Sequence, residues 1–316
     1  MQRILLALFC LAFLPAAWAA TEVVTVPMEV VKLGPHSYFV QGQSGAASST
    51  NEGFMSNAGF VVTRDGVIVF DALASPPLAE KLAGLIRKIT RQPIKRVIVS
   101  HYHADHFYGL QVFKAMGAEI WAHRAAQGAT RTEEAAQRLA QRREALFPWV
   151  DEKTQLLEAD HFIEGDMDFE MGGLKFALRH VGPAHSSEDL ALMVMNDGVL
   201  FAGDVVFRGR VPFVGDADSG GWIAALDKLI ALKPKVLVPG HGDPSRNPGA
   251  DLVFTRDYLT FVRTEMGKAA RDMVPFEEAY EKTDWSKYRA LPAFDEANRI
   301  NAYNQYLRLE REALEE

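Results

Sequence analysis

The chain is nearly free of cysteine, since its 316 residues contain a single one, Cys10. Residues 11–316 therefore offer no thiol nucleophile, no thiolate metal ligand and no disulfide framework. Chemistry in that part of the chain must use other side chains. Stability must come from a hydrophobic core, which a chain of about 300 residues can bury without cross-links.

An excess of basic residues is also missing. The chain has 34 Lys and Arg against 41 Asp and Glu, which gives a formal net charge of −7. This charge lacks the positive surface of a nucleic-acid binder, so no nucleic-acid partner is expected. No low-complexity tract and no internal repeat stands out. The composition therefore counts against a nucleic-acid-binding function.

The chain has no hydrophobic run long enough to cross a bilayer. The run Ile4–Leu14 is too short for a spanning helix, which needs about 20 residues. Arg3 precedes it, and the small-x-small sequence of residues 17–19 follows it, a pattern typical of a secretory signal. We therefore predict a signal peptide at residues 1–20, a periplasmic or secreted protein, and no stable membrane insertion after the signal is removed.

Against these absences stands the sequence His-Tyr-His-Ala-Asp-His. It directly follows Ile94–Ser100, an apolar run that predicts a buried strand. Alternate side chains of an extended backbone point the same way, so His101 and His103 can face one cation. Asp105 and His106 then face a position slightly further on. So many ligands in one loop exceed the need of one ion and favour two adjacent metals.

Further candidate ligands follow other apolar runs, where strands are expected to end. His185 lies between two such runs, Asp204 closes the run from residue 199, and His241 follows the run 236–238. Glycine beside Asp204 and on both sides of His241 permits tight turns close to a metal. Asp71 ends a fourth run in the same way. The candidate metal ligands are His101, His103, Asp105, His106, His185, Asp204 and His241.

In this order, the motifs resemble those of the metallo-β-lactamase superfamily over residues 35–245. The resemblance implies an α/β fold, a four-layer αββα sandwich with its metal site at one edge between the two sheets. It also implies two metal sites that share Asp204, the first held by His101, His103 and His185, the second by Asp105, His106 and His241. Asp71 would support these ligands through hydrogen bonds.

The residue at position 204 indicates which branch of the superfamily the chain resembles. Dedicated β-lactamases usually carry cysteine or serine there, whereas aspartate is similar to glyoxalase II-like hydrolases. The resemblance implies two divalent cations about 3.5–4 Å apart that share a nucleophilic hydroxide. Zinc is expected, and iron or manganese would accept the same ligands. Asp105 and Asp204 are the candidate catalytic residues, orienting the nucleophile's proton. The expected substrate is a small ester, thioester, lactone or lactam.

Two other functions stay open. Persulfide dioxygenases have a similar motif and hold a single iron with residues like His101, His185 and Asp204, so the protein could be an oxidoreductase. Some uncharacterised relatives that resemble this chain are found in exported sulfur-oxidation or quinoprotein systems, so the protein could be an accessory component of such a system. Metal stoichiometry separates the hydrolase from the dioxygenase, and capture of a partner from the periplasm tests the third function.

The sequence also predicts how the chain is organised. Residues 21–248 are expected to form the sandwich, with a helical insertion at about 124–157, and residues 249–316 a helical extension packed on it. The heavily charged stretch 124–147 predicts a solvated cover helix or, alternatively, a lid that contacts substrate. The Gly- and Ser-rich loop 42–53 either overhangs the metals or forms a plain surface hairpin.

Individual elements follow from periodicity. Strands are predicted at 24–33, 36–41 and 58–63, with a strand pair over 158–178 that turns at Gly172-Gly173; helices are predicted at 76–89, 222–232 and 251–273. Four histidines outside the motifs are interpreted as structural, namely His36, His123, His161 and His180.

Two arginines follow Asp204 closely, and one loop would hold both near the metals. Arg208 or Arg210 could therefore bind a substrate carboxylate or another anion. The alternative is that they form salt bridges with Asp216 or Asp218.

Overall fold

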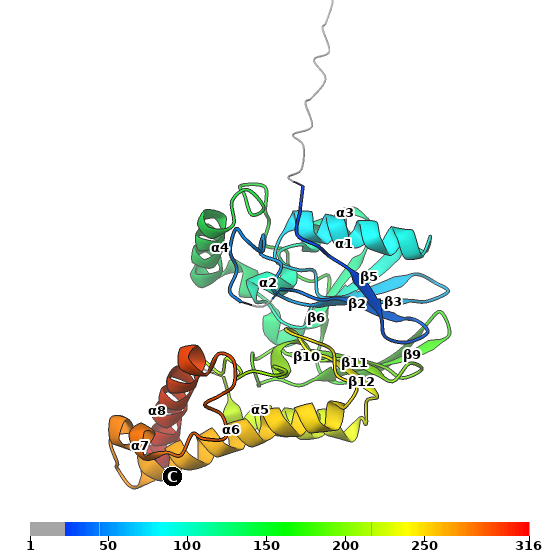
Figure 1. The fold of residues 1–316 in the computed structure, drawn as a ribbon. Helices are drawn as coiled ribbons and strands as arrows, with labels where there is room; N and C mark the ends of the chain where they lie inside the picture. Colours follow the sequence, from blue (N-terminus) through cyan, green and yellow to red (C-terminus); the bar gives the residue numbers. More distant parts are fainter. Residues whose placement is uncertain (1–22, 44, 216, 316) are drawn as a thin grey trace, which may run out of the picture.

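The structure is a computed structural model that describes residues 23–43, 45–215 and 217–315. Two β-sheets lie face to face, and helices cover the outer face of each (Figure 1). This is the expected four-layer αββα sandwich. The predicted signal peptide at residues 1–20, including Cys10, lies outside the described residues.

The first sheet is built from the N-terminal half of the chain. Its strands follow one another in sequence order; β1–β4 are antiparallel neighbours, and β4–β7 are parallel neighbours. Parallel strands send their carboxyl ends to the same edge, which is where the His-rich motif after β5 lies. The strands are β1 (Val30–Lys32), β2 (Ser37–Val40), β3 (Ala58–Val62), β4 (Val67–Phe70), β5 (Ile94–Ile98), β6 (Glu119–His123) and β7 (His161–Ile163).

The second sheet has the order β12-β11-β10-β9-β8. Only β11 and β12 run parallel within it; the other neighbouring strands are antiparallel. Gly172 and Gly173, both with positive φ, form the two-residue turn between β8 and β9, as the sequence predicts. The strands are β8 (Met167–Met171), β9 (Leu174–His180), β10 (Leu190–Val194), β11 (Val199–Phe201) and β12 (Val236–Val238).

Helices of the first half cover the outer face of the first sheet or lie near its metal-site edge. They are α1 (Pro76–Ile89), α2 (Ala104–Phe107), α3 (Leu110–Ala115) and α4 (Glu133–Ala145). Ser75 caps α1 by accepting a hydrogen bond from the backbone N–H of Leu78, and two prolines occupy its first turn. The helix buries Leu78, Leu82 and Ile86, the stripe expected from its periodicity.

Helices of the second half cover the second sheet and extend past it. α5 (Ser219–Ala231) and α6 (Pro248–Arg271) lie along the sheet, and α7 (Phe276–Lys282) and α8 (Arg299–Glu315) pack at one end of α6 (Figure 1). A turn of π-helix at residues 294–298 leads into α8. The chain thus ends in a helical extension beside the sandwich, as the predicted fold class has it. In Figure 1, α4 and α8 lie on the same side of the molecule.

A buried apolar layer fills the space between the two sheets. Phe39, Ile68, Phe176, Leu192 and Phe201 are among its members, each at most 1 % exposed. Two further cores lie on the outer sides of the sandwich, one between each sheet and the helices that cover it. These three layers provide the hydrophobic stabilisation that the near absence of cysteine requires.

Two predicted elements differ from the structure because tertiary pairing overrides local pattern. Residues 24–33 alternate between buried and exposed as expected, but only β1 forms a ladder. The carboxylate of Glu52 accepts the backbone N–H groups of Thr25 and Val26 instead of a neighbouring strand. In the stretch 158–178, the first segment is not part of the hairpin: β7 pairs with β6 in the first sheet.

The predicted helix over residues 124–147 is also divided. Two short 3-10 turns come first, around Gly128, whose φ of +87° interrupts a helix. α4 then starts at Glu133 and is capped by Thr132, whose side chain accepts a hydrogen bond from the backbone N–H of Ala135. The loop 42–53 forms turns held by Asn51, whose side chain bonds the backbone of Ala46, Ser48 and Gly53.

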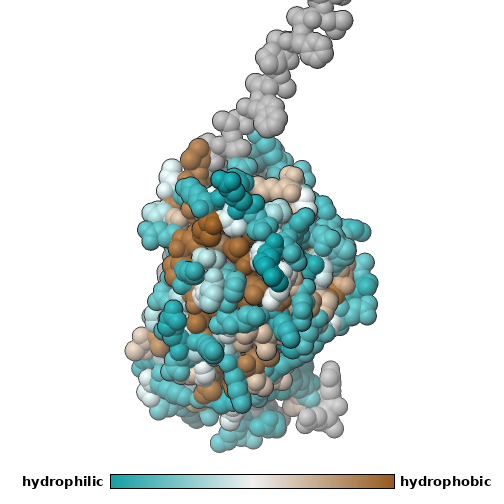
Figure 2. All heavy atoms as spheres, turned by 90° about the vertical axis from the view of Figure 1, so that its right-hand side faces the viewer, coloured by the Kyte–Doolittle hydropathy of each residue, from teal (hydrophilic) through white to brown (hydrophobic). Residues whose placement is uncertain are grey.

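One end of the sandwich has a mainly hydrophilic surface. Figure 2 views the end of the sandwich opposite α4 and α8; it shows mainly hydrophilic side chains around a hydrophobic patch in the upper half. Among the described residues, no helix has the length and apolar content needed to cross a membrane.

Candidate metal centre

The structure brings all seven predicted ligands together at one edge of the sandwich. His101 is the third residue after β5, and His103, Asp105 and His106 lie at the start of α2 or just before it. The other three lie after β9, β11 and β12. The seven fall into two groups whose potential ligand atoms lie within 4.8 Å of one another, the first His101, His103, His185 and Asp204, the second Asp105, His106 and His241.

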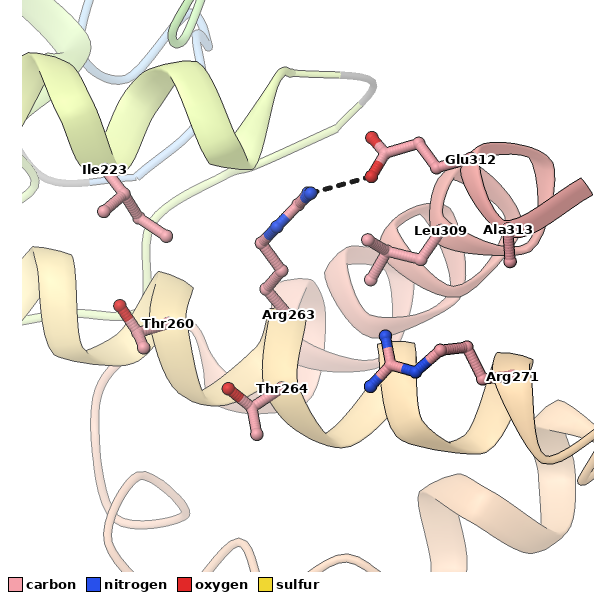
Figure 3. A pocket seen from close by; sticks show the side chains of 8 residues that line it. All are labelled: Ile223, Thr260, Arg263, Thr264, Arg271, Leu309, Glu312 and Ala313. Carbon is pink, nitrogen blue, oxygen red and sulfur yellow. Dashed lines mark hydrogen bonds and ion pairs between the residues drawn. The ribbon is translucent and has the colours of Figure 1, made fainter. Parts of the chain in front are cut away.

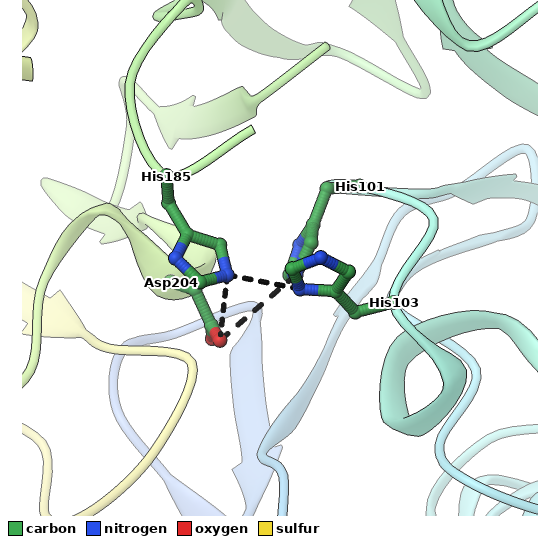
Figure 4. Close-up of side chains that lie close together, drawn as sticks. All are labelled: His101, His103, His185 and Asp204. Carbon is green, nitrogen blue, oxygen red and sulfur yellow. Dashed lines mark hydrogen bonds and ion pairs between the residues drawn. The ribbon is translucent and has the colours of Figure 1, made fainter. Parts of the chain in front are cut away.

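The first group converges on one point (Figure 4). The Nδ1 atom of His103 lies 2.9 Å from Nε2 of His101 and 2.9 Å from Nε2 of His185. The carboxylate of Asp204 completes the group, with Oδ2 at 3.5 Å from Nε2 of His185 and 3.9 Å from Nε2 of His101. Three imidazole nitrogens and one carboxylate oxygen therefore face a common centre.

The second group surrounds the other side of the same carboxylate. Nε2 of His106 lies 3.3 Å from Asp204 Oδ1, and Nε2 of His241 lies 3.3 Å from Asp204 Oδ2. Asp105 Oδ2 lies 3.4 Å from Nε2 of His106 and 3.2 Å from Nε2 of His241. Asp204 thus stands between the two groups, which is the position that a bridging ligand requires.

Hydrogen bonds on the far sides of the rings decide which nitrogens face the centre. Nδ1 of His241 lies 2.8 Å from the carbonyl oxygen of Met55, which can only accept, so this nitrogen carries the proton. Nδ1 of His106 likewise donates to Asp71 Oδ2 at 2.8 Å. The lone pair of each neutral ring is then on Nε2 and points inward, the arrangement found for histidines that bind metals.

Asp71 holds the start of the His-rich motif. Besides His106, it accepts the backbone N–H of Ser100 at 2.7 Å and the Ser100 hydroxyl at 2.8 Å. The same hydroxyl lies 2.9 Å from Nδ1 of His101. Asp71 also has a φ of +66°, in the left-handed region that aspartate and asparagine tolerate better than most residues. The supporting role expected of Asp71 therefore has a direct geometric basis.

The loop that carries His241 depends on a glycine and an asparagine. A Cβ atom on Gly240 would lie 1.8 Å from Asp204 Oδ1, so no larger residue fits there. Asn57, which lies just before β3 of the other sheet, fixes the loop: its side-chain amide donates to the carbonyls of Pro239 and Gly242, at 2.8 Å each. The role of Gly240 follows from the glycine pattern, whereas the role of Asn57 carries no recognisable local signal.

The histidines of the first group are held neutral. Burial lowers the pKa of His101 well below its usual value, and the neighbouring His106 and His103 lower it further. Burial also lowers the pKa of His103, and it lowers the pKa of His185 to about 4 against the opposing effect of Asp204. These three imidazoles are therefore neutral near pH 7, the form that binds a metal.

The second group has the opposite electrostatics. Burial opposes charge on His106, but Asp204, Asp105 and Asp71 outweigh it and raise the pKa of His106 well above its usual value. Burial likewise opposes charge on His241, yet the carboxylates raise its pKa to about 10. In return, and against burial, these histidines hold the pKa values of Asp105 and Asp204 well below their usual range. The extra protons on His106 and His241 thus balance the negative charge of the carboxylates, a role that a bound cation would take over.

The donor set fits metal ions in both groups. Ligands about 2.0–2.1 Å from a tetrahedral zinc ion lie about 3.3–3.4 Å apart, close to the separations of 2.9–3.9 Å found here. His106 Nε2 and Asp204 Oδ1 are buried and have no hydrogen-bond partner among the described residues. Buried polar atoms of this kind need a partner, and a cation between them would supply one.

Two cavities meet at His103. One, of about 610 Å³, also contains His185 and is walled by Pro183, Ala184, Phe213 and Val214, with Arg308 of α8 among its lining residues. The other, of about 550 Å³, also contains Asp105 and is walled by α4. The centre is therefore open to molecules from two sides, between α4 and α8.

A third groove lies between α6 and α8 (Figure 3) and contains none of the candidate ligands. Arg263 crosses it to form an ion pair with Glu312 at 2.7 Å and a hydrogen bond with Ser219 at 3.2 Å. Its central charge is thus already balanced, and this groove is assigned to the packing of the C-terminal helices.

The two arginines after Asp204 do not line either cavity beside the centre. Arg208 pairs with Asp251 at 3.2 Å and lies 3.9 Å from Asp243. Arg210 lies over the rings of Phe207 and Phe213. Of their predicted partners, Asp218 pairs with Arg308 instead, and Asp216 lies outside the described residues.

The four other histidines lie outside both ligand groups. His36 bonds Asp197, His123 and His180 stack with ring centroids 3.4 Å apart, and His161 is exposed near Glu119.

Comparisons with known proteins agree with this geometry. The sequence model of the Metallo-beta-lactamase superfamily matches residues 51–241. The chain is 25 % identical over 240 residues to a linear primary-alkylsulfatase from Pseudomonas sp., a match that covers 64 % of this chain and 44 % of that protein. It is 26 % identical over 198 residues to a type 2 metallo-beta-lactamase from Elizabethkingia meningoseptica, covering 60 % and 70 %. This chain thus spans less than half of the alkylsulfatase.

Solved structures share the fold. A metallo-beta-lactamase from Pontibacter korlensis superposes with a TM-score of 0.60 at 19 % identity, covering 74 % of this chain and 99 % of the other. An inverting sec-alkylsulfatase from Pseudomonas sp. superposes with a TM-score of 0.70 at 16 % identity, covering 89 % and 50 %. Because the superfamily model covers more than half of the sequence and spans the whole ligand cluster, the chain belongs to the metallo-beta-lactamase superfamily.

Proposed function

We propose that the protein is a hydrolase that uses two metal ions per chain to cleave a small ester, thioester, lactone or lactam. The observation that carries this proposal is the position of Asp204, whose two oxygens lie within 3.3–3.5 Å of ligand nitrogens in both groups. One ion would lie among His101, His103 and His185, and the other among Asp105, His106 and His241. Zinc suits this mixture of imidazole and carboxylate, and iron or manganese also accept it.

When bound, two such cations supply Lewis acidity, which lowers the pKa of a water molecule towards neutrality and polarises the scissile carbonyl. The chain's own part is to place and hold groups. Asp105 and Asp204 are ionised near pH 7, so either carboxylate can accept the proton of the attacking water. The hydrogen bonds of Asp71 and Met55 keep the rings of His106 and His241 from turning.

The cavity walls set where a substrate can lie. The 610 Å³ cavity offers the apolar side chains of Phe213, Val214 and Ala217 next to His185, which suits an acyl chain. Its charged residues, Arg308 and Asp218, are paired with each other at 3.3 Å. Aspartate at position 204 supports a resemblance to glyoxalase II-like hydrolases rather than to dedicated β-lactamases.

A second candidate activity is the hydrolysis of sulfate esters. It is supported by the similarity to a linear primary-alkylsulfatase over 64 % of this chain. The same metal pair and the same apolar cavity would serve an alkyl sulfate. The distinction is a matter of substrate, since the ligand cluster is common to both activities.

The test combines metal analysis with a substrate panel. Protein lacking residues 1–20 is purified without added metal, analysed for zinc, iron and manganese, and then assayed with and without zinc on acyl esters, thioesters, lactones, lactams, alkyl sulfates, RNA and DNA. We expect two metal ions per chain and metal-dependent turnover of at least one acyl substrate. A larger rate on alkyl sulfates than on every acyl substrate would select the second candidate.

Other outcomes would replace the proposal. One tightly bound iron with no second ion would favour the persulfide dioxygenase, and nucleic-acid cleavage faster than any acyl cleavage would exclude a small substrate. Two bound metals without turnover on any substrate would favour an accessory role, which capture of a periplasmic partner would then test. Export itself is proposed from residues 1–20 alone; a fusion of this segment to a reporter enzyme that works only outside the cytoplasm tests it.

A further inference from the structure

One face of α4 forms a wall of the second cavity beside the candidate metal centre. The cavity measures about 550 Å³ and also contains His103, Ala104 and Asp105. The residues that α4 contributes lie at positions i, i+3, i+4 and i+7, which share one face of a helix. They are Arg138, Gln141, Arg142 and Ala145.

The charges on this face are unbalanced. Among the described residues, neither Arg138 nor Arg142 has a side-chain hydrogen bond or an ion pair. The adjacent Arg143 differs: it donates to the carbonyl of Asp151 at 2.9 Å and pairs with Glu152 at 3.2 Å. Arg143 thus fastens α4 to the following loop, while Arg138 and Arg142 present two guanidinium groups to the cavity.

Of the other arginines near the centre, Arg210 has no ion pair among the described residues, but it packs over Phe207 and Phe213 and lines neither cavity. Two more are paired with carboxylates. Arg308, which lines the apolar cavity, pairs with Asp218, and Arg208 pairs with Asp251. A chain with a net charge of −7 therefore presents two unpaired cations to a cavity at the edge of its ligand cluster. Two planar guanidinium forks, one turn apart, match the geometry of a carboxylate.

We propose that Arg138 and Arg142 bind a carboxylate of the substrate, carried at the end opposite the scissile bond. The inference rests on the proposed hydrolase and adds a substrate class to it: monoesters or other acyl compounds with a free carboxylate. An acyl chain that ends in a carboxylate lies against α4 with its scissile carbonyl at the ligand cluster, whereas an acyl chain without a carboxylate enters the apolar cavity at Phe213. For the charged stretch 124–147, the proposal thus favours contact with substrate over the role of a solvated cover helix.

The test uses two esters that differ only at the far end of the acyl chain. Mono-4-nitrophenyl adipate ends in a carboxylate, and 4-nitrophenyl hexanoate ends in a methyl group. In the zinc-loaded full chain, we expect the double variant Arg138→Gln/Arg142→Gln to raise KM for the adipate ester about tenfold, since hydrogen bonds to a charged group are lost. The KM for the hexanoate ester and both kcat values should stay the same.

Arg271→Gln is the matched control. Arg271 also has no ion pair among the described residues, but it lines the separate groove between α6 and α8 (Figure 3). Its replacement also removes a positive charge from a cavity wall and should change neither KM. A KM for the adipate ester that stays unchanged in the double variant, or that rises equally for both esters, would overturn the proposal.

A binding measurement separates this inference from the proposed activity. Calorimetry on the zinc-loaded protein compares adipate with hexanoate; both can reach a metal through one carboxylate, but only adipate has a second. We expect adipate to bind about tenfold more tightly than hexanoate, and this preference to disappear in the double variant only. If neither ester is cleaved, acyl-ester hydrolysis fails while the preference still tests the arginines. Equal binding of adipate and hexanoate to the unaltered protein would refute the proposed role of the two arginines.

Discussion

The two ligand groups use the same side-chain types but have opposite protonation states. In the first group, burial and crowding of three histidines lower every imidazole pKa, that of His185 to about 4. In the second, carboxylates on several sides outweigh burial and raise the pKa of His241 to about 10. The difference shows that the same types of ligand side chain can differ in protonation state, and therefore in whether metal binding releases protons. The first group is ready for an ion, whereas the second must release protons to accept one.

Replacing Asp204 with asparagine should break both groups and have the largest effect. The Asp204 carboxylate lies within 3.3–3.5 Å of histidine nitrogens in both groups, and its charge also opposes the lowering of the His185 pKa. Loss of hydrolysis should exceed about a hundredfold, because residues that merely support a ligand already cost about 10- to 100-fold. Metal content per chain and kcat on the preferred substrate measure it.

Asp243→Asn is the control for that experiment, since Asp243 lies two residues after His241 but is exposed and bonds Gln41. It should retain both metals and full activity. Retained activity and metal content in Asp204→Asn itself would reduce Asp204 to a residue of the turn after β11.

The proton balance of the groups should appear directly in their pH dependence. Near pH 7, the raised pKa values keep His106 and His241 protonated until an ion binds, so the second metal should displace about two protons. Its affinity should therefore rise roughly a hundredfold per pH unit between pH 6 and 8, while the affinity of the first metal changes little. Calorimetry in buffers with different ionisation enthalpies counts the released protons. Equal proton release for both metals would remove the distinction between the groups.

Asp71→Asn should weaken the second group selectively. If the new amide keeps its oxygen on Ser100, its NH₂ faces Nδ1 of His106 and forces the proton onto Nε2, which then has no lone pair for a metal. Asparagine tolerates the φ of +66°, so the backbone need not change. We expect the affinity for the second metal to fall about 10- to 100-fold and that for the first to be unchanged, as measured by metal titration.

The same substitution at Asp197 provides a chemical match. Asp197 also bonds the Nδ1 of a histidine, His36, at 2.9 Å, and the hydroxyl of Ser37 at 2.7 Å, but it belongs to neither group. Asp197→Asn should leave metal binding intact. Equal loss of both metals in Asp71→Asn would mean that Asp71 supports the entire His-rich motif through Ser100 rather than His106 alone.

The ligand cluster was open to prediction from sequence because its members follow apolar strand patterns. His101, Asp204 and His241 each lie within a few residues after a strand, and the fold requires these strand ends to meet at one edge. The cavity walls were not open to prediction in this way. Arg138 and Arg142 belong to a charged helix that resembles any solvated helix, and only its packing beside His103 distinguishes them from Arg143. Arg208 lies closer in sequence to Asp204, yet it pairs with Asp251.

The difference between the groups extends to the cavities beside them, and the smallest prediction tests the apolar one. Phe213 lines the cavity at His185 and is 46 % exposed, so a bound acyl chain can cover its ring. Burying about half of a phenylalanine side chain contributes about 1 kcal/mol, or roughly a fivefold change in binding. Phe213→Ala should therefore raise KM for 4-nitrophenyl hexanoate about fivefold while KM for 4-nitrophenyl acetate, kcat and metal content stay unchanged. Met195→Ala is the matched control, because Met195 is 51 % exposed but lies away from both cavities, in the turn after β10. An equal change for the two esters would show that Phe213 only supports its loop, and the acyl chain would then belong on the α4 side together with the carboxylate.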